Sequence, residues 1–236
     1  MHNTAFITGA DRGLGLALCA GLLAQGWHVL AGQYMPEWPE LAALADRYPE
    51  SLHLLALDVS STSSVQAAAQ TAAAITEHVD LLISNAGIGS GRSELGQGLD
   101  FTAMQRAFNV NALGAIRVVE AFLPLMAQGM RRLCFVSSEA GCISLAHREG
   151  QFGYCMSKSA LNMAVRIMFN DLHPTGYTFR LYHPGWMRSY MRGTKSTRGD
   201  MEPEEAAAKA LPFFLSDRED EGRLVLIDYQ GQEWPF

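Results

Sequence analysis

The stretch Thr4-Ala5-Phe6-Ile7-Thr8-Gly9-Ala10-Asp11-Arg12-Gly13-Leu14-Gly15 decides the fold. It begins with an apolar run that predicts a short buried strand, and after its glycines apolar residues recur at helical spacing as far as Gly26. A strand, a glycine-rich turn and a helix in this order are typical of a dinucleotide-binding site, because N–H groups at a helix N-terminus bind phosphate. A purely structural glycine turn is the alternative, and the flanking elements favour the nucleotide site. The residues expected to surround the cofactor are Gly9, Asp11, Arg12, Gly13, Leu14 and Gly15.

The end of the second predicted strand, Trp27 to Gln33, should meet the adenosine ribose. Enzymes that prefer NAD often carry an acidic residue there, which binds the ribose hydroxyls. The run Ala31-Gly32-Gln33-Tyr34 contains neither an acid nor an arginine for a 2′-phosphate. Arg12 is the one local feature that favours NADP, with a solvated loop arginine as an equal alternative. We therefore expect NAD or NADP, with NADP slightly favoured.

The rest of the chain alternates between apolar strands and helical patterns. This alternation predicts parallel strands covered by helices on both faces, which is an α/β fold. No linker or low-complexity segment interrupts residues 1–236, so we expect one domain. The further strands are expected at Leu52 to Leu57, Val79 to Ser84, Arg131 to Ser137, Tyr177 to Tyr182 and Leu224 to Ile227.

Polar residues at three other positions need an explanation. Asp58 follows a predicted strand, where it could accept a hydrogen bond from the adenine amine or cap the helix that begins near Thr62. The sequence leaves both readings open. Asn109 and Asn111 lie inside a long helical pattern, although asparagine is unfavourable in a helix interior. A bend, a water site or chemistry would explain them.

Tyr154 and Lys158 lie four residues apart at the start of another predicted helix. Four residues make about one turn, so the phenol and the ammonium emerge on the same face. A nearby cation stabilises phenolate and lowers the pKa of tyrosine from roughly 10. The pair is therefore a candidate for proton transfer, and an exposed pair that arose by chance is the alternative.

The composition is that of an ordinary soluble globular protein, with 48% apolar and 18% charged residues. A net charge of −6 argues against nucleic acid or an anionic membrane as the main partner. We expect no segment with the apolar length of a membrane span, no metal site and a cytoplasmic location. The four cysteines form no C-x-x-C pair and are expected to be reduced, packed thiols.

A set of motifs occurs in order along nearly the whole chain, namely Thr8-Gly9-x-x-x-Gly13-x-Gly15, Asn85-Ala86-Gly87, Asn111, Ser138, Tyr154-x-x-x-Lys158 and Pro184-Gly185. With this set the chain resembles the short-chain dehydrogenase/reductase family, and within it the branch that contains C-factor and the sniffer-type carbonyl reductases. The resemblance implies a Rossmann-type, doubly wound sheet of about seven parallel strands. It also implies an NAD(P)-dependent enzyme that interconverts a ketone or aldehyde and its alcohol by hydride transfer.

The resemblance also assigns roles to individual residues. Tyr154 would be the general acid in reduction and the base in oxidation, and Lys158 would lower its pKa and hold the nicotinamide ribose. Ser138 would hydrogen-bond the substrate oxygen, and Asn111 would position a water that links Lys158 to solvent. A strand-end serine that satisfies backbone groups is the alternative for Ser138. The other implied cofactor contacts are Gln33, Asp58, Val59, Asn85, Ala86, Gly87, Pro184, Gly185, Met187 and Ser189.

Two segments depart from the family pattern or carry extra charge. Ser138 and Tyr154 are sixteen residues apart, a few more than is common, so His147-Arg148-Glu149 should belong to a substrate-side insertion. His147 is either an extra proton donor or an exposed loop histidine. The segment from Trp186 to Met201 should be a surface flap. Its basic residues either attract an acidic substrate or form a solvated loop, which is favoured; they are Arg188, Arg192, Lys195 and Arg198.

Two functions of other classes stay open beside carbonyl reduction. One is a cofactor-binding signalling or sensor protein of the C-factor type, in which turnover is not the main role. The other is a non-redox reaction in the same site, such as dehalogenation. The substrate and the direction of the reaction cannot be read from the sequence. The resemblance allows a homodimer or homotetramer formed through the Phe101 and Tyr154 helices.

Overall fold

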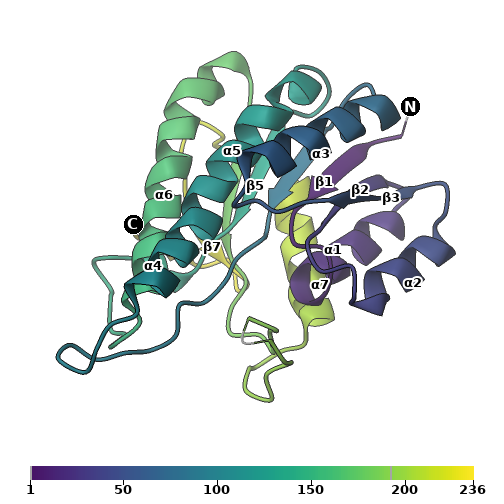
Figure 1. Ribbon diagram of the computed structural model, residues 1–236. Coiled ribbons are helices and arrows are strands. Elements are labelled where there is room, and N and C mark those ends of the chain that lie inside the picture. The colour runs from purple at the N-terminus through teal and green to yellow at the C-terminus, as the bar shows by residue number, and fades with distance from the viewer. Residues whose placement is uncertain (1, 192) are drawn as a thin grey trace.

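The computed structural model describes residues 2–191 and 193–236, so Arg192 of the predicted flap lies outside the described residues. The chain forms one sheet in the order β3-β2-β1-β4-β5-β6-β7-β8, with helices on both faces (Figure 1). Strands β1 to β7 pair in parallel, and β8 pairs with β7 in the antiparallel sense. The predicted Rossmann-type fold is confirmed, with an antiparallel strand from the C-terminal tail added to the expected sheet.

The boundaries of the elements agree with the predicted segments to within a few residues. The strands are β1 (Thr4–Ile7), β2 (His28–Gln33), β3 (Leu52–Ala56), β4 (Leu81–Ser84), β5 (Arg132–Val136), β6 (Thr178–His183), β7 (Leu226–Asp228) and β8 (Glu233–Trp234). The α-helices are α1 (Gly13–Leu23), α2 (Pro39–Arg47), α3 (Thr62–Ile75), α4 (Phe101–Phe108), α5 (Gly114–Phe122), α6 (Phe152–Leu172) and α7 (Pro203–Leu215). The short helices are the π-helical turn η1 (Asn109–Leu113) and the 3₁₀ turns η2 (Leu123–Met126), η3 (Glu139–Gly141) and η4 (His173–Thr175).

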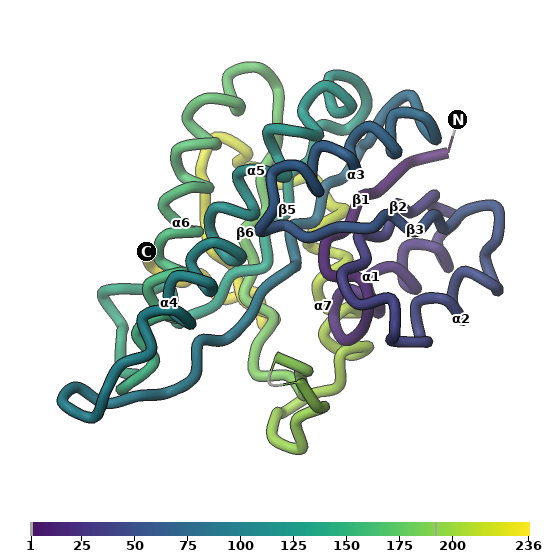
Figure 2. Tube along the Cα trace, in the orientation of Figure 1, coloured from purple at the N-terminus to yellow at the C-terminus, as the bar shows by residue number. Residues whose placement is uncertain are grey.

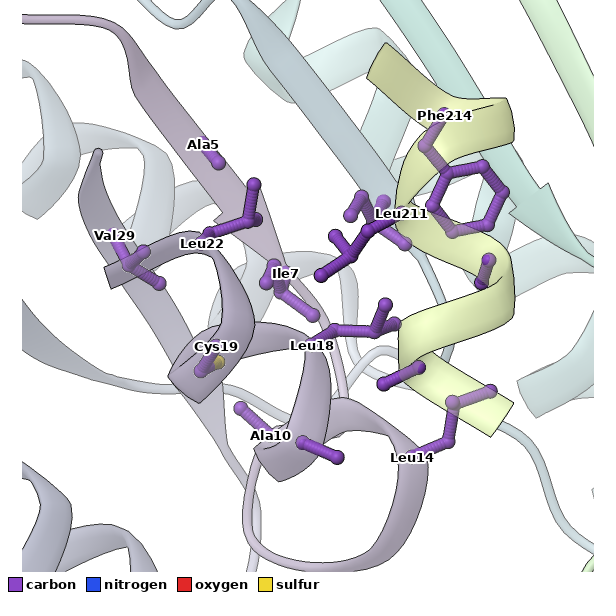
Figure 3. Packing of buried hydrophobic residues seen from close by; sticks show 14 of the residues in the cluster. Ala5, Ile7, Ala10, Leu14, Leu18, Cys19, Leu22, Val29, Leu211 and Phe214 are labelled. Atoms are coloured by element: carbon purple, nitrogen blue, oxygen red, sulfur yellow. The ribbon is translucent and has the colours of Figure 1, made fainter. Parts of the chain in front are cut away.

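Strand β1 lies in the middle of the core. Its side chains alternate between the two faces of the sheet, and Ala5, Phe6 and Ile7 have no exposed surface. Ala5 and Ile7 belong to the cluster under α1, α2 and α7, together with Leu18 and Leu211 (Figure 3). An uninterrupted apolar strand is required because both faces are covered.

The other face of the sheet is covered by α3, α5 and α6. Phe6 of β1 stacks on Phe122 of α5, with ring centroids 3.8 Å apart and an interplanar angle of 6°. Val65 of α3, Val118 of α5 and Val165 of α6 are buried in the same cluster. The two clusters hold the sheet rigidly from both sides, so the loops at its carboxyl edge start from defined positions.

The strand order reverses between β1 and β4. In open α/β sheets the crevice at such a switch point, beyond the carboxyl ends of the strands, binds ligands. The loop after β4 and the flap after β6, residues 186–201, both project from this end of the sheet (Figure 2). The topology therefore brings the glycine turn after β1 beside Asn85-Ala86-Gly87 after β4.

The continuous helix from Phe101 to Met126 corrects one expectation. By length and composition it could cross a membrane, and it is the one such helix among residues 2–191 and 193–236. Buried core helices of soluble proteins meet the same criteria. Val118 and Phe122 pack on the sheet, whereas Phe108 and Ile116 are partly exposed. The apolar composition of this helix thus comes from residues on two of its faces, one packed in the core and one exposed on the surface.

Candidate active site

The glycine turn between β1 and α1 accepts only glycine at two of its positions. Gly9 has φ +65°, and a Cβ there would lie 2.9 Å from the Cα of Ala86. A Cβ at Gly15 would lie 2.1 Å from the carbonyl oxygen of Gly9. The backbone of this turn is therefore bare at the N-terminus of α1, where N–H groups and the helix dipole favour phosphate. These features fit the pyrophosphate of a dinucleotide.

Side-chain hydrogen bonds join this turn to the end of β4. The Thr8 hydroxyl oxygen accepts from the backbone N–H groups of Asn85 and Ala86, at 3.0 and 2.9 Å. The Asn85 amide donates to the carbonyl oxygens of Thr8 and Gly9, at 2.9 and 3.1 Å. Asn85 and Ala86 therefore hold the two edges of the switch point together, which places them beside any cofactor in the crevice.

Asp11 organises the chain that follows β2. One oxygen of its buried carboxylate accepts from the backbone N–H groups of Tyr34 and Met35, at 2.9 and 2.7 Å. Gln33, the last residue of β2, precedes this contact directly. The loop expected to meet the adenosine ribose is thus shaped by an acid from the glycine turn.

Arg12 packs against two aromatic rings that also contact each other, with their centroids 5.4 Å apart. Its guanidinium carbon lies 4.1 Å from the centroid of the Trp38 ring and 5.2 Å from that of Tyr190. Its guanidinium also donates to the carbonyl oxygens of Tyr190 and Gly193, at 3.3 and 3.5 Å. The alternative of a solvated loop arginine is wrong, because Arg12 links the glycine turn to the flap.

The structure excludes one of the two readings of Asp58. Ser61, not Asp58, is the N-cap of α3 and accepts from the N–H of Ser64. Asp58 instead accepts from the N–H and the hydroxyl of Ser60, at 2.9 and 2.6 Å. The capping role for Asp58 is therefore wrong, and its contact with adenine stays a prediction. Val59 beside it is buried in the core.

Asn111 lies in the π-helical turn η1, which interrupts the long helix. Its side-chain oxygen accepts from the N–H of Ile88 at 2.8 Å, and its amide donates to the carbonyl oxygen of Ile88 and to the Ser157 hydroxyl, both at 2.9 Å. The asparagine is thus explained by a π-bulge, a feature common at functional sites. It ties the loop after β4 to α6, and its role in positioning a water stays a prediction.

Lys158 is buried at the centre of the site, with 4% of its surface exposed. Its ammonium donates to the carbonyl oxygen of Val136 at 2.9 Å, and among the described residues no other acceptor contacts it. Burial lowers its pKa from 10.5 to about 8. A Cβ at Gly87 would lie 3.6 Å from its Nζ. A buried ammonium with donors to spare fits the hydroxyls of a nicotinamide ribose.

Tyr154 differs from the expectation in its ionisation. Burial raises its pKa above the ordinary value of 10, and a hydrogen bond with Ser138 only partly offsets this. Lys158 Nζ lies 6.0 Å from the centre of the Tyr154 ring. The expected lowering of the pKa of Tyr154 by Lys158 is therefore wrong, because the effect of burial dominates. A phenol with a raised pKa is held protonated, as a proton donor must be.

Ser138 is the N-cap of η3, two residues after the end of β5, and is buried. Its hydroxyl donates to Glu139 Oε2 at 2.6 Å and accepts from the N–H of Ala140 at 3.1 Å. Arg148 pairs with the other oxygen of Glu139, and His183 Nε2 lies 3.5 Å from Oε2. The sequence analysis named neither Glu139 nor His183 as a site residue. Glu139 was detectable as an acid directly after Ser138, whereas no local signal marks His183.

The remaining expected residues occupy less central places. Gly185 has φ +79°, and a Cβ there would lie 2.6 Å from the Tyr229 ring, so only glycine fits this turn after Pro184. Met187 forms a bridge with Met201 at the base of the flap. The carbonyl oxygen of Ser189 accepts from the N–H of Ser196 at 2.9 Å. Leu14, the second residue of α1, is buried in the core beside the glycine turn.

His147 and the basic flap residues make contacts of their own. His147 is exposed, with its Nδ1 3.3 Å from the carbonyl oxygen of Leu145. Arg188 pairs with Glu202, and Lys195 Nζ lies 2.7 Å from the same carboxylate. Arg198 is exposed on the flap. These positions favour the alternatives of an exposed loop histidine and a solvated flap.

Comparisons with known proteins agree with this geometry. Residues 3–199 match the family model described as short chain dehydrogenase. A curated protein named C-signal, from Myxococcus xanthus, is 40% identical over 162 residues, which cover 68% of this chain and 95% of that protein.

Solved structures are similar over the whole chain. The NADPH-bound carbonyl reductase from chicken fatty liver superposes with a TM-score of 0.86 at 25% identity, covering 100% of this chain and 99% of that chain. Sniffer, a carbonyl reductase of D. melanogaster, has the same fold, with a TM-score of 0.89 at 23% identity and full coverage of both chains.

Proposed function

The chain belongs to the short-chain dehydrogenase family and is an NAD(P)-dependent oxidoreductase, and we propose that it interconverts a ketone or aldehyde and its alcohol through Tyr154. One observation carries this proposal. The phenol of Tyr154, the hydroxyl of Ser138 and the buried ammonium of Lys158 converge at the carboxyl edge of the sheet, beside the bare glycine turn. Solved relatives at 25% and 26% identity hold NADPH and NADP.

The chemistry follows from what these side chains can donate. A bound nicotinamide cofactor supplies or accepts the hydride. As a carbonyl carbon is reduced, negative charge develops on its oxygen, and the Tyr154 phenol and Ser138 hydroxyl stabilise that charge. The Tyr154 oxygen then gives up its proton. Lys158 would hold the ribose of the cofactor through the N–H donors that Val136 leaves free, and the same steps in reverse serve oxidation.

Binding of the cofactor tests the proposal most directly. Purified protein titrated with NADPH and NADH should quench or enhance the fluorescence of the bound cofactor in a saturable manner. Reduction of a probe aldehyde, 4-nitrobenzaldehyde, can then be followed by oxidation of the bound cofactor. Failure of both cofactors to bind would contradict the proposed function.

We propose that Arg12 binds the 2′-phosphate of NADP and so gives the protein a preference for NADP over NAD. Arg12→Met should raise the Kd for NADPH by about 10-fold or more, because a hydrogen bond to a charged group contributes about 1.5–3 kcal/mol. The Kd for NADH should change by less than about threefold. Tyr190→Leu is the matched control, because it loosens the contact with the flap but keeps the charge. If Arg12→Met raised the Kd for NADPH and the Kd for NADH equally, Arg12 would not select NADP, and its contacts with the flap would be its role.

We also propose that the protein forms a homodimer or homotetramer through α4, α5 and α6. Apolar side chains lie exposed on these helices, with Met163 61%, Ile167 53% and Phe108 42% exposed. Apolar surface of this kind gains stability when a second copy covers it. Light scattering should show an oligomer that Ile167→Glu dissociates, whereas Ile75→Glu on α3 leaves its mass unchanged. A wild-type monomer at micromolar concentration would contradict the proposal.

The similarity to C-signal supports a second candidate function, a cofactor-binding signalling protein in which turnover is secondary. Such a protein would keep the glycine turn and the buried Lys158, because both serve cofactor binding. It would not require the phenol of Tyr154. The two functions therefore separate on a variant that binds cofactor but cannot transfer a proton.

A further inference from the structure

Glu139 and Arg148 form an ion pair directly beside the proposed reaction centre. The side chain of Glu139 is 13% exposed and that of Arg148 is 31% exposed. Arg148 comes from the loop between η3 and α6, and its other nitrogen donates to Gln151 Oε1 at 2.9 Å. Its guanidinium carbon lies 6.0 Å from the centre of the Tyr154 ring. The pair thus spans the space between Ser138 and Tyr154.

The position of Glu139 creates an electrostatic problem for carbonyl reduction. Its Oε2 accepts the proton of Ser138 at 2.6 Å, so a carboxylate lies one hydroxyl away from the place where the substrate oxygen must bind. Negative charge develops on that oxygen in the transition state. A like charge at this range opposes it strongly when water is excluded. An unpaired Glu139 would therefore inhibit the reaction.

We propose that Arg148 is a positioning residue that neutralises Glu139, so that the single proton of the Ser138 hydroxyl can turn from Glu139 to the substrate oxygen and the carboxylate does not oppose the charge that develops there. This inference rests on the proposed function and deepens it. The carboxylate is held through both of its oxygens, Oε1 by Arg148 and Oε2 by the Ser138 hydroxyl. The Ser138 proton points to Glu139 in this structure and has to turn to the substrate oxygen for catalysis. Arg148 weakens the hold of the carboxylate on that proton and cancels the charge that Glu139 brings.

The ionisation of Glu139 agrees with this pairing. Burial alone would raise its pKa, yet the hydrogen bonds from Ser138 and Arg148 and the nearby positive charge hold the pKa below the ordinary value of 4.5. Glu139 is therefore charged at neutral pH. The titratable and charged groups that face it are Arg148 from the loop, His183 at the end of β6, Cys142 after η3, and Tyr154 and Cys155 on α6.

The proposal predicts an asymmetry between the two single variants. Arg148→Met leaves the carboxylate unpaired, so kcat for reduction of 4-nitrobenzaldehyde should fall on the order of 10- to 100-fold, with a smaller change in KM. Glu139→Gln removes the negative charge and keeps the shape, so it should lower kcat clearly less than Arg148→Met does. The double variant Glu139→Gln with Arg148→Met should regain most of the activity that Arg148→Met loses.

The pH profile separates this role from a merely structural ion pair. Without Arg148, burial should raise the pKa of Glu139, so the loss in Arg148→Met should shrink as the pH falls and the carboxyl takes up a proton. Protonation of His183, 3.5 Å from Glu139, would act in the same direction. The double variant should show no such gain, because it lacks the carboxylate that either proton would neutralise.

Three results would overturn the inference. They are equal losses in the two single variants, no rescue in the double variant, and a Glu139 pKa that carboxyl ¹³C NMR finds unchanged in Arg148→Met. The NMR measurement needs no turnover. Arg92→Met is the matched control, because Arg92 also forms ion pairs, at 3.7 Å from Glu149 and 4.0 Å from Glu94, but on the exposed surface. This variant should leave kcat within about twofold of the wild type. Absence of all wild-type turnover would count against the proposed function instead.

Discussion

Replacement of Tyr154 by phenylalanine is expected to lower kcat for carbonyl reduction by about 1,000-fold or more, since the variant loses both the proton donor and one stabilising hydrogen bond. Phenylalanine keeps the ring, so the packing of α6 should survive. The Kd for NADPH should stay within about twofold, because Lys158 and the glycine turn are unchanged. Steady-state kinetics and cofactor titration on the same preparation measure both effects.

Cysteine at position 155 provides the matched control for Tyr154→Phe. Cys155 is adjacent on α6 and half-buried, so Cys155→Ser tests whether any change in this turn disturbs the enzyme. It should keep kcat within about threefold. Turnover that survives in Tyr154→Phe would show that Tyr154 is not the proton donor. If the inactive variant still replaces the wild-type protein in cells, signalling rather than turnover is the main role.

Lys158→Met is expected to abolish activity and at the same time to stabilise the cofactor-free protein. The loss of its ribose contacts should lower kcat/KM for NADPH by about 100-fold or more, at about 1.5–3 kcal/mol for each hydrogen bond to a charged group. The lowered pKa of Lys158, 10.5 to about 8, corresponds to roughly 3 kcal/mol at about 1.4 kcal/mol per unit. Removal of the buried charge should raise the Tm at pH 7 by about 4 °C or more.

The sign of this effect reverses the usual case for lysine. Because the folded-state pKa lies below the unfolded one, the unfolded chain binds more protons between pH 8 and 10.5, and stability rises with pH across that window. The gain in Tm from Lys158→Met should therefore be full at pH 7 and nearly absent at pH 10.5. Calorimetry of the cofactor-free proteins at both values measures it. A lower Tm for the variant at pH 7 would show that Lys158 contributes to stability.

Local patterns were enough to predict an α/β fold of parallel strands with a dinucleotide-binding turn after the first strand. Ala5-Phe6-Ile7 had to be a buried strand because apolar residues without polar alternation require cover on both faces. Gly9 and Gly15 predicted a tight turn because other residues clash there, as the contacts with Ala86 and with the turn itself show. Each of these signals depends on neighbours within a few residues. These features could therefore be predicted from the sequence.

The ionisation of the site residues and the ion pairs between them could not be predicted from local patterns. A spacing of four residues placed Tyr154 and Lys158 on one helix turn, but it could not reveal that burial would raise one pKa and lower the other. Burial depends on how α6 packs against β5, which no local pattern describes. The charge state of the site is therefore a property of the packed structure.

The stretch from Thr4 to Gly15 thus predicted a dinucleotide-binding α/β fold from the sequence alone, and the spacing of Tyr154 and Lys158 predicted a candidate proton donor, since hydrophobic period and glycine sterics act locally. Only the tertiary structure brought Arg12 to the flap residue Tyr190 and Arg148 to Glu139. Both contacts join irregular loops, and the positions of these loops depend on how the whole sheet is assembled. Long, flexible arginine side chains form them without leaving any periodic signal in the chain.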